Sequence, residues 1–255
     1  MPENPTAKPS SKYKAFMFGG IVTLYIGPDR KKMEIHKKLL ASISPELDKH
    51  VNNNMKEGIE GIINFPDEGE EAFTLFSEWA YTGSYTIVDD MLTLKPLDSI
   101  GESQGTAFGQ SHGSTFGQSP GLFGGSSHKS VPVTLLVKAD PWPSLRMHLQ
   151  LYVFSHKFNI PTLTQLARSN FSKEIDPVEL TRGTDAAGLV SVIEYAYDNL
   201  LDSDPVPIFL ARYASWKLGF LRDKDEFIQL VSARPELMKE LFMTLTGPPS
   251  KPALS

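Results

Sequence analysis

The sequence predicts an α+β fold, in which a short N-terminal sheet with helices is followed by an all-helical region. Side chains in residues 21–26 alternate between two faces, which is the period of a β-strand. Residues 27–29, Gly-Pro-Asp, form a turn sequence, and a second apolar segment follows at residues 33–35, so we expect a hairpin. After residue 145 the apolar residues recur at helical spacing instead.

The N-terminal elements follow in order along the chain. Residues 1–14 carry three prolines and few apolar side chains, so we expect a flexible arm. After the hairpin, Ser42 or Ser44 can begin a short helix with Pro45 in its first turn, where the missing N–H donor of proline costs nothing.

A third strand and a longer helix complete the predicted N-terminal part. The strand is expected at residues 62–65 and the helix between residues 66 and 83. Asp67 is its expected N-cap. Glu70 and Glu71 lie in the first turn, where the helix dipole favours anions.

These segments and their turn residues carry a family resemblance. The matching positions are Ile21 to Ile26, Met33 to Ile35, His36, Leu40, Ser44, Ile62 to Phe65, Ala72 to Ala80, Tyr81, Thr82 and Gly83. In this order they resemble a fungal-type BTB/POZ domain, which implies a short mixed sheet capped by helices. The resemblance covers residues 21–86 and resumes at residues 145–171, which are similar to the last two helices of that domain. It also implies that His36 is a buried core residue that forms a hydrogen bond.

A low-complexity insertion separates the two matching parts, and we expect residues 99–139 to be disordered. Residues 103–127 contain no charged side chain and consist mainly of Gly, Ser, Gln and Phe. Phe108, Phe116 and Phe123 are each followed by Gly, and they are similar to the repeats of FG nucleoporins, whose aromatics make weak multivalent contacts. A neutral low-complexity loop that happens to contain Phe is the open alternative.

The predicted organisation is therefore one interrupted domain with an extension. It comprises a BTB/POZ-like domain at 15–98 and 140–175, a helical extension at 176–246 and a tail at 247–255. The helices expected after the insertion lie at 145–156, 163–171, 189–197, 209–216, 227–231 and 237–245. We expect the apolar side chains before and after the insertion to share one hydrophobic core.

Composition excludes several classes of function. The chain has 255 residues, a net charge of −5 and no cysteine, which rules out disulfides, thiolate metal sites and cysteine nucleophiles. The acidic balance gives no general attraction to nucleic acid. No apolar run approaches the ~20 residues that cross a bilayer, and the N-terminus lacks the features of a secretory signal. We expect an intracellular protein of the cytoplasm or nucleus.

The sequence offers no convincing catalytic or metal site. Gly-x-Ser-x-Gly occurs at residues 101–105, 109–113 and 117–121, but a nucleophile elbow needs a strand before it and a helix after it. The six histidines show no zinc spacing. We therefore expect no enzyme, with no catalytic residues, cofactor, metal or small-molecule substrate, and we keep a hydrolase only as an out-of-class alternative. Residues 30–32, Arg-Lys-Lys, are interpreted as a charged turn that protects the hairpin from edge pairing.

The resemblance implies binding of other proteins. Our first choice is an adaptor whose BTB/POZ surface self-associates or docks a protein partner. The alternative is a substrate receptor that recruits a cullin scaffold in a ubiquitin ligase. Cullin recruiters often have an apolar-x-Glu triplet after the Tyr-Thr-Gly turn, and the nearest match is Ile87-Val88-Asp89. Gly19 and Gly20 stand where many BTB domains have an acidic residue of the dimer's charged pocket, so dimerisation through that pocket is not expected.

Overall fold

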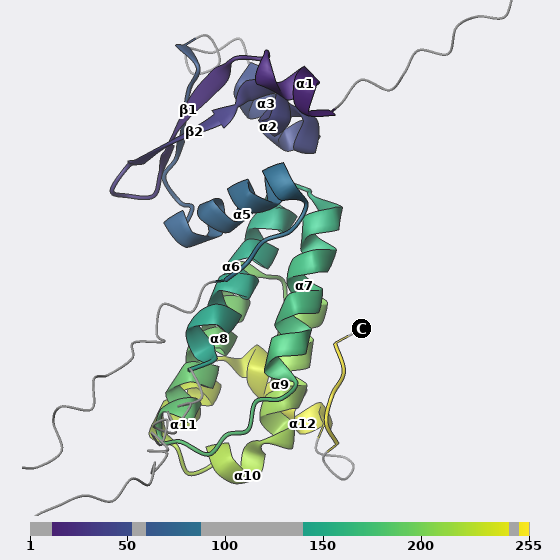
Figure 1. The fold of residues 1–255 in the computed structure, drawn as a ribbon. Helices are drawn as coiled ribbons and strands as arrows, with labels where there is room; N and C mark the ends of the chain where they lie inside the picture. The colour runs from purple at the N-terminus through teal and green to yellow at the C-terminus, as the bar shows by residue number, and fades with distance from the viewer. Residues whose placement is uncertain (1–11, 53–59, 88–139, 245–249, 255) are drawn as a thin grey trace, which may run out of the picture. The chain divides into compact units, whose positions relative to one another are not determined.

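The computed structural model describes residues 12–52, 60–87, 140–244 and 250–254 (Figure 1). These residues belong to one compact unit, which joins the chain on both sides of the predicted insertion. The insertion itself lies outside the described residues, as do the three Gly-x-Ser-x-Gly matches.

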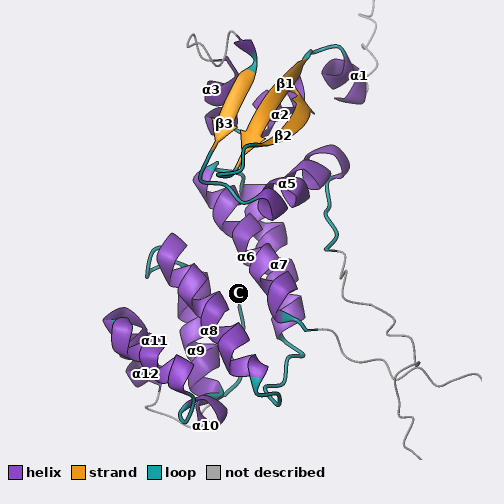
Figure 2. Cartoon of the chain, turned by 90° about the vertical axis from the view of Figure 1, so that its left-hand side faces the viewer, coloured by secondary structure: helices purple, strands orange, loops and turns teal. Residues whose placement is uncertain are grey.

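The N-terminal part is built on a three-stranded mixed sheet (Figure 2). Its strands are β1 (Ile21–Ile26), β2 (Lys31–His36) and β3 (Ile62–Phe65), in the order β2-β1-β3. β1 pairs antiparallel with β2, with Ile21 opposite His36, and parallel with β3, with Thr23 opposite Ile62. The predicted hairpin and third strand are confirmed, and the parallel pair makes the sheet mixed.

Helices α1 (Lys12–Met17), α2 (Lys37–Ile43), α3 (Pro45–Asn52) and α5 (Glu70–Thr82) accompany the sheet. Because α1 begins at Lys12, the last residues that we assigned to the N-terminal arm are helical. Of the two serines proposed to begin α3, Ser44 does so, since its Oγ accepts a hydrogen bond from the N–H of Leu47 at 3.1 Å. The prediction for Asp67 was wrong: α5 begins at Glu70, and Gly69 is its N-cap without a side-chain hydrogen bond.

The all-helical region that we predicted is confirmed. Its elements are α6 (Trp142–Lys157), α7 (Pro161–Ile175), α8 (Thr184–Asn199), α9 (Pro205–Trp216), α10 (Leu218–Leu221), α11 (Asp225–Ala233) and α12 (Pro235–Thr244). α6 packs beside α7, α8 contacts α6, α9 and α11, and α12 contacts α9 (Figures 1 and 2). The short α10 was not predicted, because four residues are too few to show a period.

Aromatic side chains join the two parts of the chain in one hydrophobic core. The Phe154 ring on α6 lies 5.3 Å from the Phe73 ring and 4.8 Å from the Phe76 ring, both on α5. Phe158, just beyond α6, contacts Phe65 of β3 at 5.6 Å between ring centroids. All five side chains are at most 3% exposed, and burying each contributes about 1.5–3 kcal/mol. The predicted core shared across the insertion is therefore confirmed.

Candidate functional site

Two of the residues that carry the family resemblance contact each other. His36 lies at the end of β2, and its Nδ1 is 2.8 Å from the hydroxyl of Tyr81 on α5. That hydroxyl also accepts a hydrogen bond from the backbone N–H of His36 at 3.2 Å, and the rings pack edge to face at 5.8 Å. The predicted hydrogen bonding of His36 is thus present. The expected burial was wrong, since His36 is only half-buried where the end of α5 covers the sheet edge.

The other resemblance residues have structural roles. Leu40 is fully buried, and Ser44 caps α3. Gly83 follows α5 at φ +82°, and its N–H donates to the carbonyl of Trp79 at 2.7 Å. This left-handed backbone is the usual end of a helix and favours glycine. These residues shape the scaffold.

Most of the partner-binding candidates lie outside the described residues. This holds for Phe108, Phe116, Phe123 and Asp89. Ile87 is described, and it is half-buried against the hydrophobic core. Part of its side chain is therefore already used by the fold.

The structure exposes an apolar surface that sequence reasoning missed. Met17 is 63% exposed, Phe18 83% and Ile21 60%, and we call these three residues the N-terminal apolar patch. Phe16, one position earlier, packs against the core instead. The signal was available in the sequence, since three consecutive large apolar residues at the end of a short helix cannot all face inward.

Two glycines fix the chain between the members of this patch. Gly19 donates its N–H to the carbonyl of Phe16 at 2.9 Å and lies so close to Lys38 that a Cβ there would be 2.5 Å from the Lys38 Cγ. Gly20 has φ +78°, and its carbonyl accepts the N–H of Lys37 at 2.9 Å. The backbone that presents Phe18 is therefore held at both ends.

Two of the three basic residues of the predicted turn pair with acidic residues of the chain. Lys31 pairs with Glu70 at 2.8 Å and Lys32 with Glu34 at 2.7 Å, all on the surface. The hydrogen bond to Glu70 raises the pKa of Lys31. The Arg30 guanidinium lies 4.9 Å from the centre of the Tyr25 ring. These pairings agree with a charged turn rather than with an anion site.

A buried polar network lies where α6 meets α7. The imidazole of His148 is 2.8 Å from the Tyr85 hydroxyl through Nδ1 and 2.8 Å from the Glu174 carboxylate through Nε2. Burial alone would raise the pKa of Glu174, but hydrogen bonds from His148 and Ser144 lower it. Ser144 donates a hydrogen bond to this carboxylate and not to His148. A nucleophilic serine would instead be hydrogen-bonded to the group that acts as its general base, such as a histidine. The network therefore joins these helices through Glu174, which both Ser144 and His148 contact.

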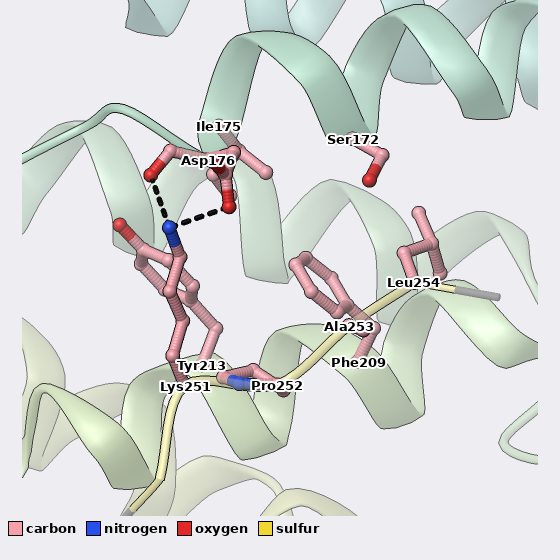
Figure 3. Close-up of a pocket in the computed structure, with 9 residues that line it drawn as sticks. All are labelled: Ser172, Ile175, Asp176, Phe209, Tyr213, Lys251, Pro252, Ala253 and Leu254. Carbon is pink, nitrogen blue, oxygen red and sulfur yellow. Dashed lines mark hydrogen bonds and ion pairs between the residues drawn. The ribbon is translucent and has the colours of Figure 1, made fainter.

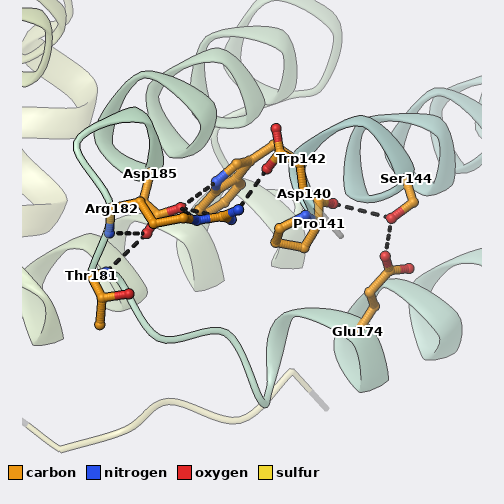
Figure 4. Close-up of polar contacts among 8 residues, drawn as sticks. All are labelled: Asp140, Pro141, Trp142, Ser144, Glu174, Thr181, Arg182 and Asp185. Atoms are coloured by element: carbon orange, nitrogen blue, oxygen red, sulfur yellow. Dashed lines mark hydrogen bonds and ion pairs between the residues drawn. The ribbon is translucent and has the colours of Figure 1, made fainter. Parts of the chain in front are cut away.

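A buried carboxylate, that of Asp185, attaches the start of α6 to α8 (Figure 4). Asp185 is fully buried and accepts from the backbone N–H groups of Thr181 at 2.9 Å and Arg182 at 2.7 Å. The indole N–H of Trp142 donates to it at 3.2 Å, and Nε of Arg182 at 3.1 Å. Burial would raise the pKa of Asp185, but these donors together lower it.

An apolar groove lies on the helical region between α10, α11 and α12. It has a volume of about 290 Å³ and is lined mainly by apolar side chains, among them Phe227, Ile228, Val231 and Phe242. Ile228 is 48% exposed and Phe242 66%. The helical region therefore presents apolar surface as well.

Within the described ranges, no group of three or more His, Asp or Glu side chains could hold a metal ion. No helix in that part of the chain is both long and apolar enough to cross a membrane. Searches of protein-family models and of curated proteins found no match to this chain.

Proposed function

We propose that the protein is an intracellular protein–protein interaction adaptor, and that it self-associates through the N-terminal apolar patch. The observation that carries this proposal is the exposure of Phe18, 83%, beside two further exposed apolar residues within five positions. The resemblance of the sequence in residues 21–86 to a BTB/POZ domain also favours a role in binding other proteins. No catalytic activity is part of the proposal.

Leaving these apolar side chains in water is unfavourable. Covering Phe18 completely would contribute about 1.5–3 kcal/mol, and Met17 and Ile21 would add to it. Aromatic residues and methionine are enriched in the buried centres of interfaces, where a few side chains supply most of the affinity. A specific interface covers about 800 Å² on each partner, so this patch would form its centre.

The surroundings of the patch fit the polar rim of such an interface. Lys38 packs its aliphatic stem beside Gly19 and is exposed to solvent. Strand β2, at one edge of the sheet, carries the exposed charged residues Lys31, Lys32 and Glu34, which discourage a second copy from adding a strand there. The apolar patch is therefore a better contact than the β2 edge of the sheet.

The test replaces Phe18 by Asp. Because Phe18 makes few contacts within the chain, Phe18→Asp should fold normally while placing a charge at the centre of the interface. Leu201→Asp is the matched control, since Leu201 is also a large apolar residue, 78% exposed, between α8 and α9. We expect light scattering to find an oligomer for the unmodified chain and for Leu201→Asp, and a monomer for Phe18→Asp. If all three chains have the same mass, the patch is not the interface.

A further inference from the structure

Residues 250–254 lie as an extended segment against α7 and α9 (Figure 3). The ammonium of Lys251 is 2.5 Å from a carboxylate oxygen of Asp176 and 2.8 Å from the backbone carbonyl of the same residue. Asp176 is the C-cap of α7, where the helix dipole also favours a cation. One end of the segment is thus held by charge.

The other end of the segment is held by apolar contact. Leu254 is half-buried and packs against the hydrophobic core. Between the two ends, the segment covers a hollow of about 130 Å³ whose floor includes Ile175, Phe209 and Tyr213. Ile175 belongs to α7, and Phe209 and Tyr213 belong to α9; with the segment in place Tyr213 is 1% exposed and Phe209 5%. The groove that the segment covers is therefore formed by α7 and α9, and the hollow lies between these helices and the segment.

The contacts of the segment are those of a replaceable ligand rather than of a core element. Lys251 and Ala253 are exposed, and the hollow beneath them is not filled by their side chains. Lys251 also lies 5.9 Å from the Trp216 ring, over which Lys217 lies at 3.8 Å. The two ammonium groups repel each other, so part of the attraction to Asp176 is offset.

We propose that the groove formed by Ile175, Asp176, Phe209 and Tyr213 is a binding site for an extended peptide with a basic residue three positions before an apolar one. Residues 250–254 occupy it in cis, and a partner peptide of the same chemistry binds by displacing them. This surface is separate from the N-terminal apolar patch, so the inference is independent of the proposed self-association.

The test uses a fluorescently labelled hexapeptide with the sequence of residues 250–255 and two forms of the protein. One form is the full chain, and the other ends at Thr244. A short link gives the attached segment an effective concentration on the order of 1 mM, so a peptide with a Kd of about 100 µM should bind the full chain about tenfold more weakly than the shortened chain. Fluorescence anisotropy measures both affinities.

Substitutions then identify the contacts. In the shortened chain, Asp176→Lys should weaken peptide binding at least tenfold. The matched control Asp223→Lys changes an exposed carboxylate between α10 and α11 and should leave the affinity within twofold. A peptide carrying Lys251→Glu tests the same ion pair from the side of the ligand, whether or not Asp176→Lys folds.

Two results would overturn the proposal. The first is a peptide affinity that is the same for the full and the shortened chain, including no detectable binding to either. The second is a Lys251→Glu peptide that binds the shortened chain as tightly as the unmodified one. Because neither measurement depends on the mass of the protein, their failure is distinguishable from a failure of the proposed self-association.

Discussion

Replacing Asp185 by Ala should destabilise the fold strongly, because this buried carboxylate accepts four N–H donors (Figure 4). The side chain of Arg182 is 44% exposed and can return to water. The backbone N–H groups of Thr181 and Arg182 and the indole N–H of Trp142 would lose their acceptor. Each unsatisfied buried donor costs about 1–3 kcal/mol. Water entering the vacated space offsets part of this sum, so we expect a loss of about 3–5 kcal/mol from these three donors.

Urea unfolding followed by circular dichroism measures this loss, and Asp140→Ala is the matched control. Asp140 contacts the same Arg182 guanidinium at 3.4 Å, but its side chain is 43% exposed. Exposed pairs contribute about 0–1 kcal/mol, so the control should change the free energy of unfolding by less than about 1 kcal/mol. Equal losses in the two variants would refute the reasoning, since they would mean that burial of the carboxylate is not what matters.

The stabilities of the unmodified chain and of Asp185→Ala, compared at several pH values, test whether the N–H donors stabilise the charged carboxylate. The N–H donors lower the pKa of Asp185 below its ordinary value of 3.8 in the folded chain, against the effect of burial. A carboxylate with a depressed folded-state pKa stabilises the fold fully above its unfolded-state pKa, and loses this contribution as the pH falls through the folded value. The stability difference between the unmodified chain and Asp185→Ala should therefore be constant near pH 7 and shrink below about pH 4. A difference that grows on acidification would contradict the sign.

Three further substitutions test the scaffold by urea unfolding. Phe154→Ala should cost about 3–5 kcal/mol, and its unfolding should remain a single transition because both parts of the chain share this core; two separate transitions would contradict that. Gly83→Ala should cost about 1–2 kcal/mol from its positive φ alone, since a Cβ there meets nothing within 4 Å. In the control Gly219→Ala the added Cβ also meets nothing within 4 Å, but φ is not positive, so this variant should be neutral or slightly stabilising. Gly188→Ala should cost about 1–3 kcal/mol, because its Cβ would lie 2.1 Å from the rigid ring of Trp142; a neutral result would show that α8 shifts freely.

The elements of this fold could be predicted where a regular pattern covers enough residues. Alternation in residues 21–26 predicted β1, and the helical period after residue 145 predicted the longer helices of the C-terminal region. The helix expected between residues 66 and 83 agrees with α5, which ends just before Gly83. Each of these depends on local chemistry, which the sequence carries directly.

Features that depend on distant contacts could not be predicted in the same way. Asp67 has a good residue type for an N-cap, but the turn after β3 continues to Gly69 before α5 begins. Tyr85, His148 and Asp185 are each ordinary in sequence, and only the packing of α6 against its neighbours gives them their partners. The docking of residues 250–254 likewise depends on a groove formed by two other helices.

Buried polar contacts add direction to the hydrophobic core that the residues before and after the predicted insertion share. Hydrophobic burial is not directional. Apolar contacts alone would therefore hold α5 and α6 together without fixing the course of the chain segments next to these helices. Near the point where the described chain stops, Tyr85 is held by His148, and burial raises the pKa of Tyr85 to about 12, so this hydroxyl keeps its proton. Where the described chain resumes, Trp142 is held by Asp185. Both anchors belong to or contact α6, so this helix fixes the chain at Tyr85 and at Trp142.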